Sequence, residues 1–178
     1  MTPLLLLRGI AALVVAAVAL PVLAQDGLGP GRRPQAPRIC MTPPQMEAEA
    51  IVRAGMIIRA YARDCARLGH DATILPLWGA FDQANAQRFR DAVQLRSEAY
   101  KLNYPDDPYA EQRATNEVLA SRQMSEFAPQ ECMALADLVG SFNDWDAFMR
   151  HVRTTVLGQV KTAFKLCPKK RAGAAAGQ

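Results

Sequence analysis

Four cysteines are the residues of this 178-residue chain that are best suited to covalent chemistry: Cys40, Cys65, Cys132 and Cys167. No C-x-x-C pair occurs, which argues against a thioredoxin-type redox motif, and without C-x-x-C-H there is no attachment site for c-type haem. An even number of cysteines in an exported chain favours disulfide bonds. We therefore expect two disulfides.

Metal or haem binding would depend on the two histidines, His70 and His151. With the cysteines oxidised, a closed Cys/His zinc site lacks its thiolates, and no metal site is predicted. An alternative is noncovalent haem held by Met41 or Met46 near one end of a bundle and His151 on the last helix. The simpler interpretation has methionines that fill the core and two partly solvated histidines, so the predicted cofactor is none.

A tyrosine-rich segment runs from residue 100 to residue 109 and offers a candidate interaction surface formed by Tyr100, Tyr104, Asp106, Asp107 and Tyr109. Tyrosine rings supply large contact area with few rotors, which suits a protein-contact surface. Asn103 with the two aspartates could instead approach a calcium ion, although the spacing does not match a helix-loop-helix calcium loop. The structural alternative is that the aspartates cap a helix while the tyrosines cover the bundle end.

Catalytic motifs are absent from the sequence, which has no G-x-S-x-G, no H-E-x-x-H and no glycine-rich phosphate loop. Glu47 and Glu49 are two residues apart, so they diverge around a helix and cannot serve one substrate. The predicted class is a non-enzymatic protein. A small-ligand or haem-binding bundle is the alternative, and an enzyme with dispersed site residues is the third hypothesis.

The first 24 residues have the pattern of a secretory signal peptide: Arg8, an apolar run from residue 10 to residue 20, and small residues before a cut between Ala24 and Gln25. This predicts a periplasmic or secreted protein; retention of the segment as an anchor is the alternative. Residues 25–38 are expected to be a flexible basic linker, residues 39–167 the folded domain, and residues 168–178 a disordered basic tail.

Apolar residues in the folded part recur at helical spacing, and no sustained strand pattern is present. The spacing predicts helices over about 42–68, 76–103, 107–127, 129–140 and 145–166. Thr42, Pro43 and Gln45 form the start signal of the first helix, and Gly69 ends it. The predicted fold is all-α, an up-down four-helix-type bundle with a short extra helix before the last long helix.

This topology restricts the disulfides. Cys40 and Cys65 flank a helix of about 25 residues, so they lie roughly 35 Å apart, whereas a disulfide needs Cα atoms within about 7 Å. In an up-down bundle, Cys40 shares one end with Cys167, and Cys65 shares the other with Cys132. The predicted pairs are Cys40–Cys167 and Cys65–Cys132.

One short segment, Met41-Thr42-Pro43-Pro44-Gln45, is similar to the L-T-x-x-Q motif of the Spy-type periplasmic helical chaperones. The match covers five residues that also form a general helix cap, and it occurs once, where those chaperones usually carry it twice. The chain is therefore not assigned to that family. The resemblance implies a chaperone-like role as one form of the predicted protein-contact function, beside structural, inhibitor and adaptor roles.

The net charge of +4 belongs to the ends of the chain. Residues 39–167 contain fourteen basic and sixteen acidic residues, a net charge of −2, so a nucleic-acid partner is not predicted. We expect another envelope protein as the partner. The basic ends could add weak electrostatic contact with anionic lipid or cell-wall polymer.

Overall fold

A computed structural model describes residues 39–121 and 128–168, all of which belong to one unit of the chain. The predicted signal peptide, the linker to residue 38, the end of the predicted third helix at 122–127 and the tail from residue 169 lie outside the described residues. Of the described residues, 77% are helical. The predictions of a mostly helical chain and of two disulfides are confirmed, whereas the up-down four-helix arrangement is not.

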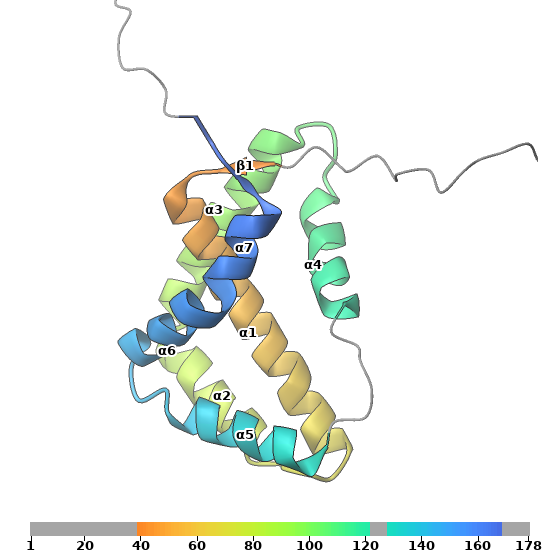
Figure 1. Ribbon diagram of the computed structural model, residues 1–178, viewed down its shortest axis with the longest axis vertical. Coiled ribbons are helices and arrows are strands. Elements are labelled where there is room, and N and C mark those ends of the chain that lie inside the picture. Colours follow the sequence, from red (N-terminus) through yellow and green to blue (C-terminus); the bar gives the residue numbers. More distant parts are fainter. Residues whose placement is uncertain (1–38, 122–127, 169–178) are drawn as a thin grey trace, which may run out of the picture. The chain divides into compact units, whose positions relative to one another are not determined.

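The long helix α1 (Pro43–Arg67) is the element around which the others pack, since it contacts α2, α3, α4, α5 and the last helical segment (Figure 1). It begins as predicted. The side chain of Gln45 accepts a hydrogen bond from the N–H of Thr42 at 2.9 Å, and Pro43 occupies the first turn, where its missing N–H costs nothing. Gly69 follows the helix with φ of +73°, a conformation that glycine adopts without strain.

The predicted second helix is two helices, α2 (Ile74–Ala84) and α3 (Ala86–Asn103), which meet at Asn85. Asn85 has φ of −114° and ψ of 20°, and its side-chain amide donates to the carbonyl of Phe81 at 3.0 Å. The backbone N–H of Asn85 donates to the same carbonyl at 3.1 Å, so the side chain adds a second, local hydrogen bond of the kind that favours asparagine at a helix boundary. The prediction of one continuous helix is corrected accordingly.

Three shorter helices follow: α4 (Ala110–Ala120), α5 (Pro129–Gly140) and α6 (Trp145–His151). A carboxylate side chain accepts a backbone hydrogen bond at the start of each of these helices. Asp107 accepts from the N–H of Tyr109 at 3.1 Å, Glu131 from Ala128 at 2.9 Å, and Asp144 from Ala147 at 2.7 Å. These caps satisfy N–H groups that a helix start leaves without an internal partner.

The predicted last helix is also interrupted. A π-helical turn, η1 (Val152–Val156), separates α6 from α7 (Leu157–Ala163). Val152, Val156 and Val160 are all buried. Their spacing of four exceeds the 3.6 residues of an α-helical turn, so one widened turn keeps the three valines on the same face.

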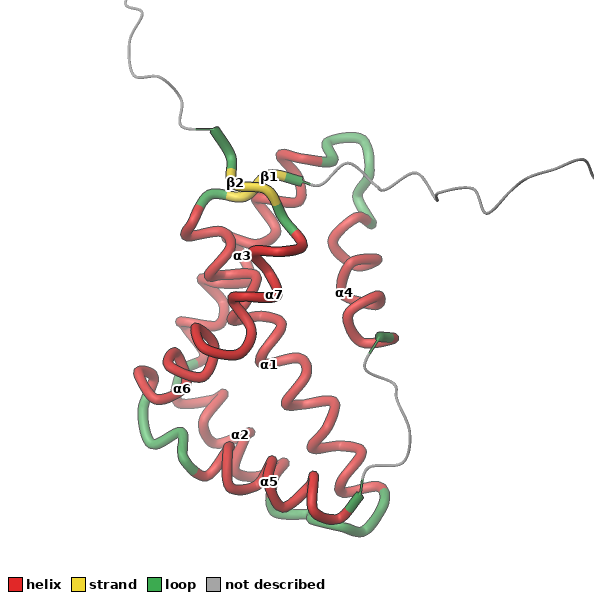
Figure 2. The backbone as a smooth tube through the Cα atoms, in the orientation of Figure 1, coloured by secondary structure: helices red, strands yellow, loops and turns green. Residues whose placement is uncertain are grey.

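Two short strands contradict the expectation that strands are absent. The strand β1 (Cys40–Met41) pairs in parallel with β2 (Lys165–Leu166), with Cys40 opposite Lys165 (Figure 2). Lys165 and Cys167 donate to the carbonyls of Ile39 and Met41, each at 3.1 Å. Strands of two residues are too short to show alternation, so the sequence gives no signal for them.

The disulfides join Cys40 to Cys167 and Cys65 to Cys132, the pairs that the helical topology predicts. The Cα atoms are 4.7 Å and 5.7 Å apart. Between them the core contains a cluster of rings from α2, α3 and the α5–α6 region: Trp78, Phe81, Phe89, Phe142, Trp145 and Phe148. Within the described ranges, no helix combines the length and apolar character needed to cross a membrane.

Candidate binding site

The predicted tyrosine surface is divided by the fold. Tyr100 is only 4% exposed, and its ring stacks on Tyr104 with the centroids 6.5 Å apart. Tyr109 is 65% exposed, and Asp106 is exposed beside it. The exposed part of the predicted surface is therefore the turn from Asp106 to Tyr109, and Tyr100 belongs to the interior.

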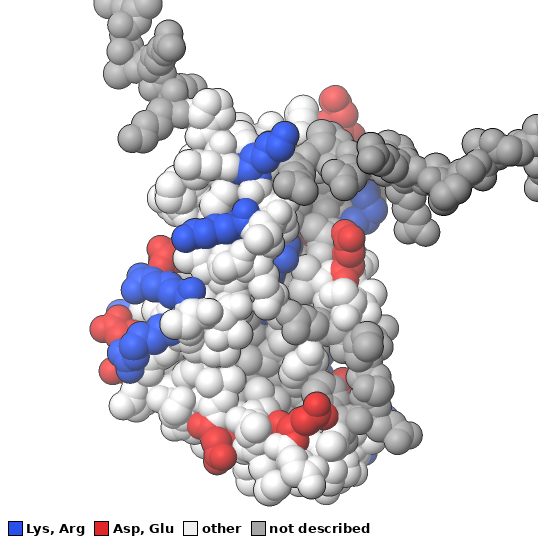
Figure 3. Space-filling model, in the orientation of Figure 1, with Lys and Arg blue, Asp and Glu red and all other residues white. Residues whose placement is uncertain are grey.

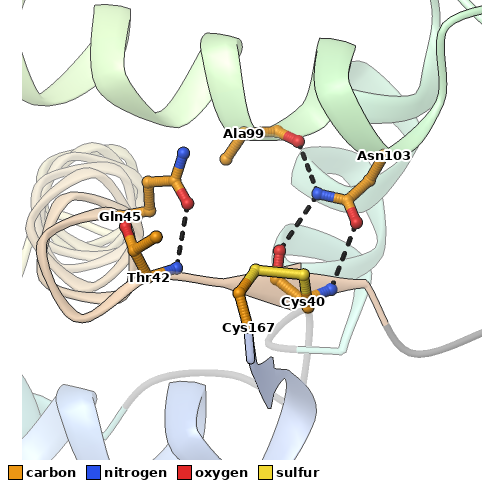
Figure 4. Close-up of a disulfide and its surroundings, with 6 residues drawn as sticks. All are labelled: Cys40, Thr42, Gln45, Ala99, Asn103 and Cys167. Carbon is orange, nitrogen blue, oxygen red and sulfur yellow. Dashed lines mark hydrogen bonds between the residues drawn. A yellow bond between two sulfur atoms is a disulfide. The ribbon is translucent and has the colours of Figure 1, made fainter. Parts of the chain in front are cut away.

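The alternative calcium ligands are engaged elsewhere. The side-chain amide of Asn103 binds both backbone groups of Cys40: its oxygen accepts from the N–H at 3.2 Å and its nitrogen donates to the carbonyl at 3.0 Å (Figure 4). The same nitrogen donates to Ala99 at 2.8 Å. Asp107 pairs with Arg113. Neither Asn103 nor Asp107 is thus left to share an ion with Asp106.

In the haem alternative, Met41 and His151 are not brought together. Met41 is fully buried next to the β2 strand, whereas His151 lies at the other end of the η1–α7 segment, roughly 20 Å away along the helix. The ring of His151 packs on Phe142, and burial lowers the pKa of His151. Within residues 39–121 and 128–168, no group of three or more His, Cys, Asp or Glu side chains could hold a metal ion.

A buried ionic network connects α1, α3 and α4. The Nε atom of Arg96 donates to Oε2 of Glu49 at 2.6 Å, and Arg53 donates to the other oxygen of Glu49 at 2.5 Å. Glu49 is 0% exposed and Arg96 is 4% exposed. Burial alone would lower the pKa of Arg96, but the charge and the hydrogen bond of Glu49, with smaller effects of Tyr100 and Glu111, together outweigh burial and raise the pKa.

The same network holds α4 in place. Arg96 donates to Glu111 at 2.7 Å and to the Thr115 hydroxyl at 2.9 Å, and Ser97 donates to the second oxygen of Glu111 at 2.5 Å. Ala110 is the only buried residue of α4. This helix is therefore attached to α1 and α3 by polar contacts at one side rather than by an apolar face that fills the space beneath it.

A cavity of about 530 Å³ lies beside α4. Its wall brings together α1, α3, α4 and the end of α7 with Ile39, and the residues that line it are mostly apolar or aromatic: Ile39, Arg53, Tyr100, Tyr104, Ala110, Arg113, Ala114, Glu117, Val118, Ser121, Ala163 and Phe164. Cavities of about 300–1,000 Å³ with apolar walls and few polar groups are typical of small-molecule sites. We refer to this space as the α4 cavity.

Two polar groups of the α4 cavity have unused hydrogen-bonding capacity. The Tyr100 hydroxyl is buried and finds no hydrogen-bond partner among the described residues. Arg53, whose guanidinium lies 5.3 Å from the centre of the Phe164 ring, makes hydrogen bonds within the described residues through Nε alone. A buried polar group without a partner costs about 1–3 kcal/mol.

Burial raises the pKa of Tyr100 to about 12, and the negative charge of Glu49 acts in the same direction. Arg96 and Arg53 oppose these effects in part. The hydroxyl is therefore protonated at neutral pH. In chemical terms the α4 cavity offers a hydrogen-bond donor and a guanidinium beside an apolar wall, which suits binding of an amphiphile better than proton transfer.

Sequence reasoning missed this site. Glu49 and Arg53 have the i, i+4 spacing of a solvated ion pair, and nothing local shows that Arg96, 47 residues away, buries them. The available signal was the composition of residues 110–121, which hold small and polar residues and only two larger aliphatic ones, Val118 and Leu119. His151, the residue on which an enzymatic site would have depended, does not line the α4 cavity.

Comparisons of the chain with protein-family models, with curated proteins and with solved structures found no match.

Proposed function

We propose that the chain is an exported, non-enzymatic binding protein of the cell envelope, a helical bundle clamped by two disulfides that binds an amphiphilic small molecule in the α4 cavity. The observation that supports it is the α4 cavity itself, which combines an apolar wall with the unpartnered Tyr100 hydroxyl. In this proposal α1, the α2–α3 segment, α4 and the segment from α6 to α7 form an up-down frame. The export and the envelope location rest on the signal sequence and on the disulfides, which persist in oxidising compartments.

The preferred ligand class follows from the polar groups of the α4 cavity. Arg53 supplies a positive charge beside Phe164, and Tyr100 supplies a neutral donor. A guanidinium and a hydroxyl both donate to carboxylate oxygens, and charge-assisted hydrogen bonds of this kind are the stronger ones. A carboxylate with an apolar chain satisfies both groups and covers the apolar wall, so dodecanoate is a suitable probe.

A substitution that fills the α4 cavity tests the proposal. Ala114 lies on the wall contributed by α4, so Ala114→Phe is expected to abolish the rise in thermal midpoint that dodecanoate gives to the wild-type protein. The matched control is Ala120→Phe, an exposed position at the end of the same helix, which should keep that rise. Equal responses of the two variants, or no response of the wild type, would count against the α4 cavity as the ligand site.

A protein partner is the second candidate, and the exposed turn supports it. Leu102 is 77% exposed and Tyr109 is 65% exposed, on either side of a turn that also presents Asp106. Exposed aromatic and aliphatic side chains of this kind serve as anchors in protein interfaces. A double substitution, Leu102→Ser with Tyr109→Ser, should remove association with an envelope protein and leave dodecanoate binding intact, which separates the two candidates.

A further inference from the structure

Beyond the α4 cavity, exposed basic residues lie along the last helical segment and β2. Arg150, Arg153, Lys161 and Lys165 are all exposed. Figure 3 shows blue side chains gathered over α6 and α7 with some red side chains beside them, while other red side chains lie over α5. The folded unit has a net charge of −2 between residues 39 and 167, so this gathering is a local separation of charge rather than a consequence of composition. We call these four residues the basic face.

Acidic residues offset only part of the positive charge of the basic face. Glu47 accepts hydrogen bonds from Nε and Nη2 of Arg153 at 3.0 Å and 2.9 Å, and Asp146 is exposed on α6. Lys161 and Lys165 form no ion pair with the described residues. Lys169, Lys170 and Arg171 follow β2 in the sequence and lie outside the described residues.

Apolar residues accompany the basic ones at this end. Leu166 is 63% exposed in β2, next to the cysteine of the Cys40–Cys167 disulfide. A groove of about 470 Å³, lined mainly by apolar groups of Pro43, Pro44, Met46, Leu157 and Leu166, has Lys161 and Glu47 in its wall. The N–H of Cys167 donates to Met41, so the strand and the disulfide together hold Leu166 outward and prevent it from turning into the core.

We infer that the basic face and Leu166 form a docking surface for the headgroup region of an anionic lipid bilayer. The basic side chains would lie against lipid phosphates, and Leu166 with the adjoining groove would enter the interface between headgroups and acyl chains. Charge complementarity identifies the occupant, because a row of exposed cations that ends at an exposed leucine matches a surface that is anionic outside and apolar inside. The contact is peripheral and involves the folded unit, in addition to the basic tail.

Vesicle binding tests this inference. The mature chain from Gln25 should co-sediment with vesicles of phosphatidylglycerol and phosphatidylcholine, much less with phosphatidylcholine alone, and less as salt rises. Each basic residue at such a surface contributes roughly fivefold to the affinity, so Lys161→Glu with Lys165→Glu should weaken binding by well over tenfold. Leu166→Ser should weaken it several-fold with the salt dependence unchanged.

The matched control is Arg63→Glu with Arg67→Glu, which changes the net charge equally but lies at the other end of α1, about 30 Å from Pro43. It should bind within about twofold of the wild type. Equal loss in this control would show that net charge alone drives binding and would overturn the inference. A second outcome would also overturn the inference. In it, the Lys161/Lys165 variant binds vesicles like the wild type, whereas replacement of Lys169, Lys170 and Arg171 by Gln abolishes binding.

Two further outcomes distinguish lipid docking from binding of an anionic polymer and from ligand binding in the α4 cavity. If polyglutamate, an anionic polymer without lipid, binds as strongly as the vesicles and Leu166→Ser changes nothing, the surface recognises polymer charge and the lipid assignment is wrong. Ala114→Phe should leave vesicle binding unchanged, because the α4 cavity and the basic face share no residue. Failure of the ligand proposal would therefore be distinguishable from failure of this one.

Discussion

Arg96 donates from Nε to the carboxylate of Glu49 at 2.6 Å, and both side chains are almost completely removed from water. The pair joins α1 to α3, and Arg96 extends the connection to Glu111 on α4. A buried ion pair often contributes little compared with well-packed apolar residues, but its members depend on each other. The Glu49–Arg96 pair therefore determines how α4 is attached to α1 and α3, and α4 forms one wall of the α4 cavity.

Removing one member of the pair should be strongly destabilising. Glu49→Leu leaves Arg96 and Arg53 without their shared carboxylate, and we expect the free energy of unfolding to fall by about 3–5 kcal/mol. The double variant Glu49→Leu with Arg96→Met removes the buried cation as well and should regain most of the loss. Urea unfolding of both variants measures the difference.

An exposed ion pair provides the control for this comparison. Arg153 and Glu47 are 60% and 37% exposed at their side chains, so Arg153→Ala should change the free energy of unfolding by less than about 1 kcal/mol. If Glu49→Leu proved as mild as this control, the network would not be the element that holds α4, and the structural basis of the α4 cavity would be wrong.

Tyr100 should give the protein a stability loss at alkaline pH. The folded state retains the Tyr100 proton up to a pKa of about 12, whereas the unfolded chain releases it near the ordinary value of 10.0. Between these pH values the unfolded state binds fewer protons, so the free energy of unfolding falls as the pH rises through this window. Chemical unfolding of the wild type and of Tyr100→Phe at several pH values measures the contribution of Tyr100.

Tyr100→Phe should also show whether the Tyr100 hydroxyl contributes to stability or to ligand binding. Since the hydroxyl has no partner among the described residues, its removal should leave stability at neutral pH unchanged or slightly raised. The same substitution should weaken dodecanoate binding by roughly tenfold, the equivalent of one lost hydrogen bond of about 1.4 kcal/mol. A clear loss of stability at neutral pH would mean that the hydroxyl has a hydrogen-bond partner within the protein and would contradict this prediction.

The two disulfides should differ in accessibility rather than in their contribution to stability. They close segments of 127 and 67 residues, for which the chain-entropy model gives similar stabilisation of about 4–5 kcal/mol each. Cys65 and Cys132 are 0% exposed, while Cys40 and Cys167 are half-buried. Mild reduction followed by alkylation and peptide mass mapping should therefore label Cys40 and Cys167 first; simultaneous labelling of all four cysteines would contradict the burial difference.

Asn103 should be a stabilising residue, not a metal ligand. Its amide binds both backbone groups of Cys40, and Asn103→Ala leaves those groups without partners, which should cost about 2 kcal/mol and speed hydrogen exchange at the Cys40 amide. Asn116, an exposed asparagine of α4, supplies the control Asn116→Ala, with no measurable change expected. A Ca²⁺-dependent rise in thermal midpoint that disappears in Asn103→Ala would instead restore the calcium alternative.

Short sequence patterns predicted the helix boundaries that depend on neighbouring residues. The start of α1 at Thr42, its end before Gly69 and the restart at Pro129 follow from residues within one turn of each boundary. Helix length excluded the pair Cys40–Cys65, because a helix of 25 residues separates the two cysteines, and the choice between the other two pairings used the expected order of the helices.

Features that depend on distant partners were not predictable in this way. The break at Asn85 and the π turn at Val152–Val156 interrupt apolar stripes that appear continuous in sequence. The burial of Glu49 depends on Arg96, and Tyr100 lies where residues of four helices meet around the α4 cavity. Such juxtapositions arise from packing, which no short-range pattern encodes.

Photo-crosslinking with a diazirine-bearing dodecanoate tests the central claim most directly, because it locates the bound chain on the protein. Peptide mapping of the mature protein should place the label on residues of the α4 cavity wall, chiefly Ala114, Val118 and Phe164, with excess dodecanoate competing it away and Ala114→Phe preventing it. Label concentrated on Leu102, Tyr109 or Leu166, unchanged by Ala114→Phe, would show adsorption to exposed apolar residues and would contradict a binding site beside α4.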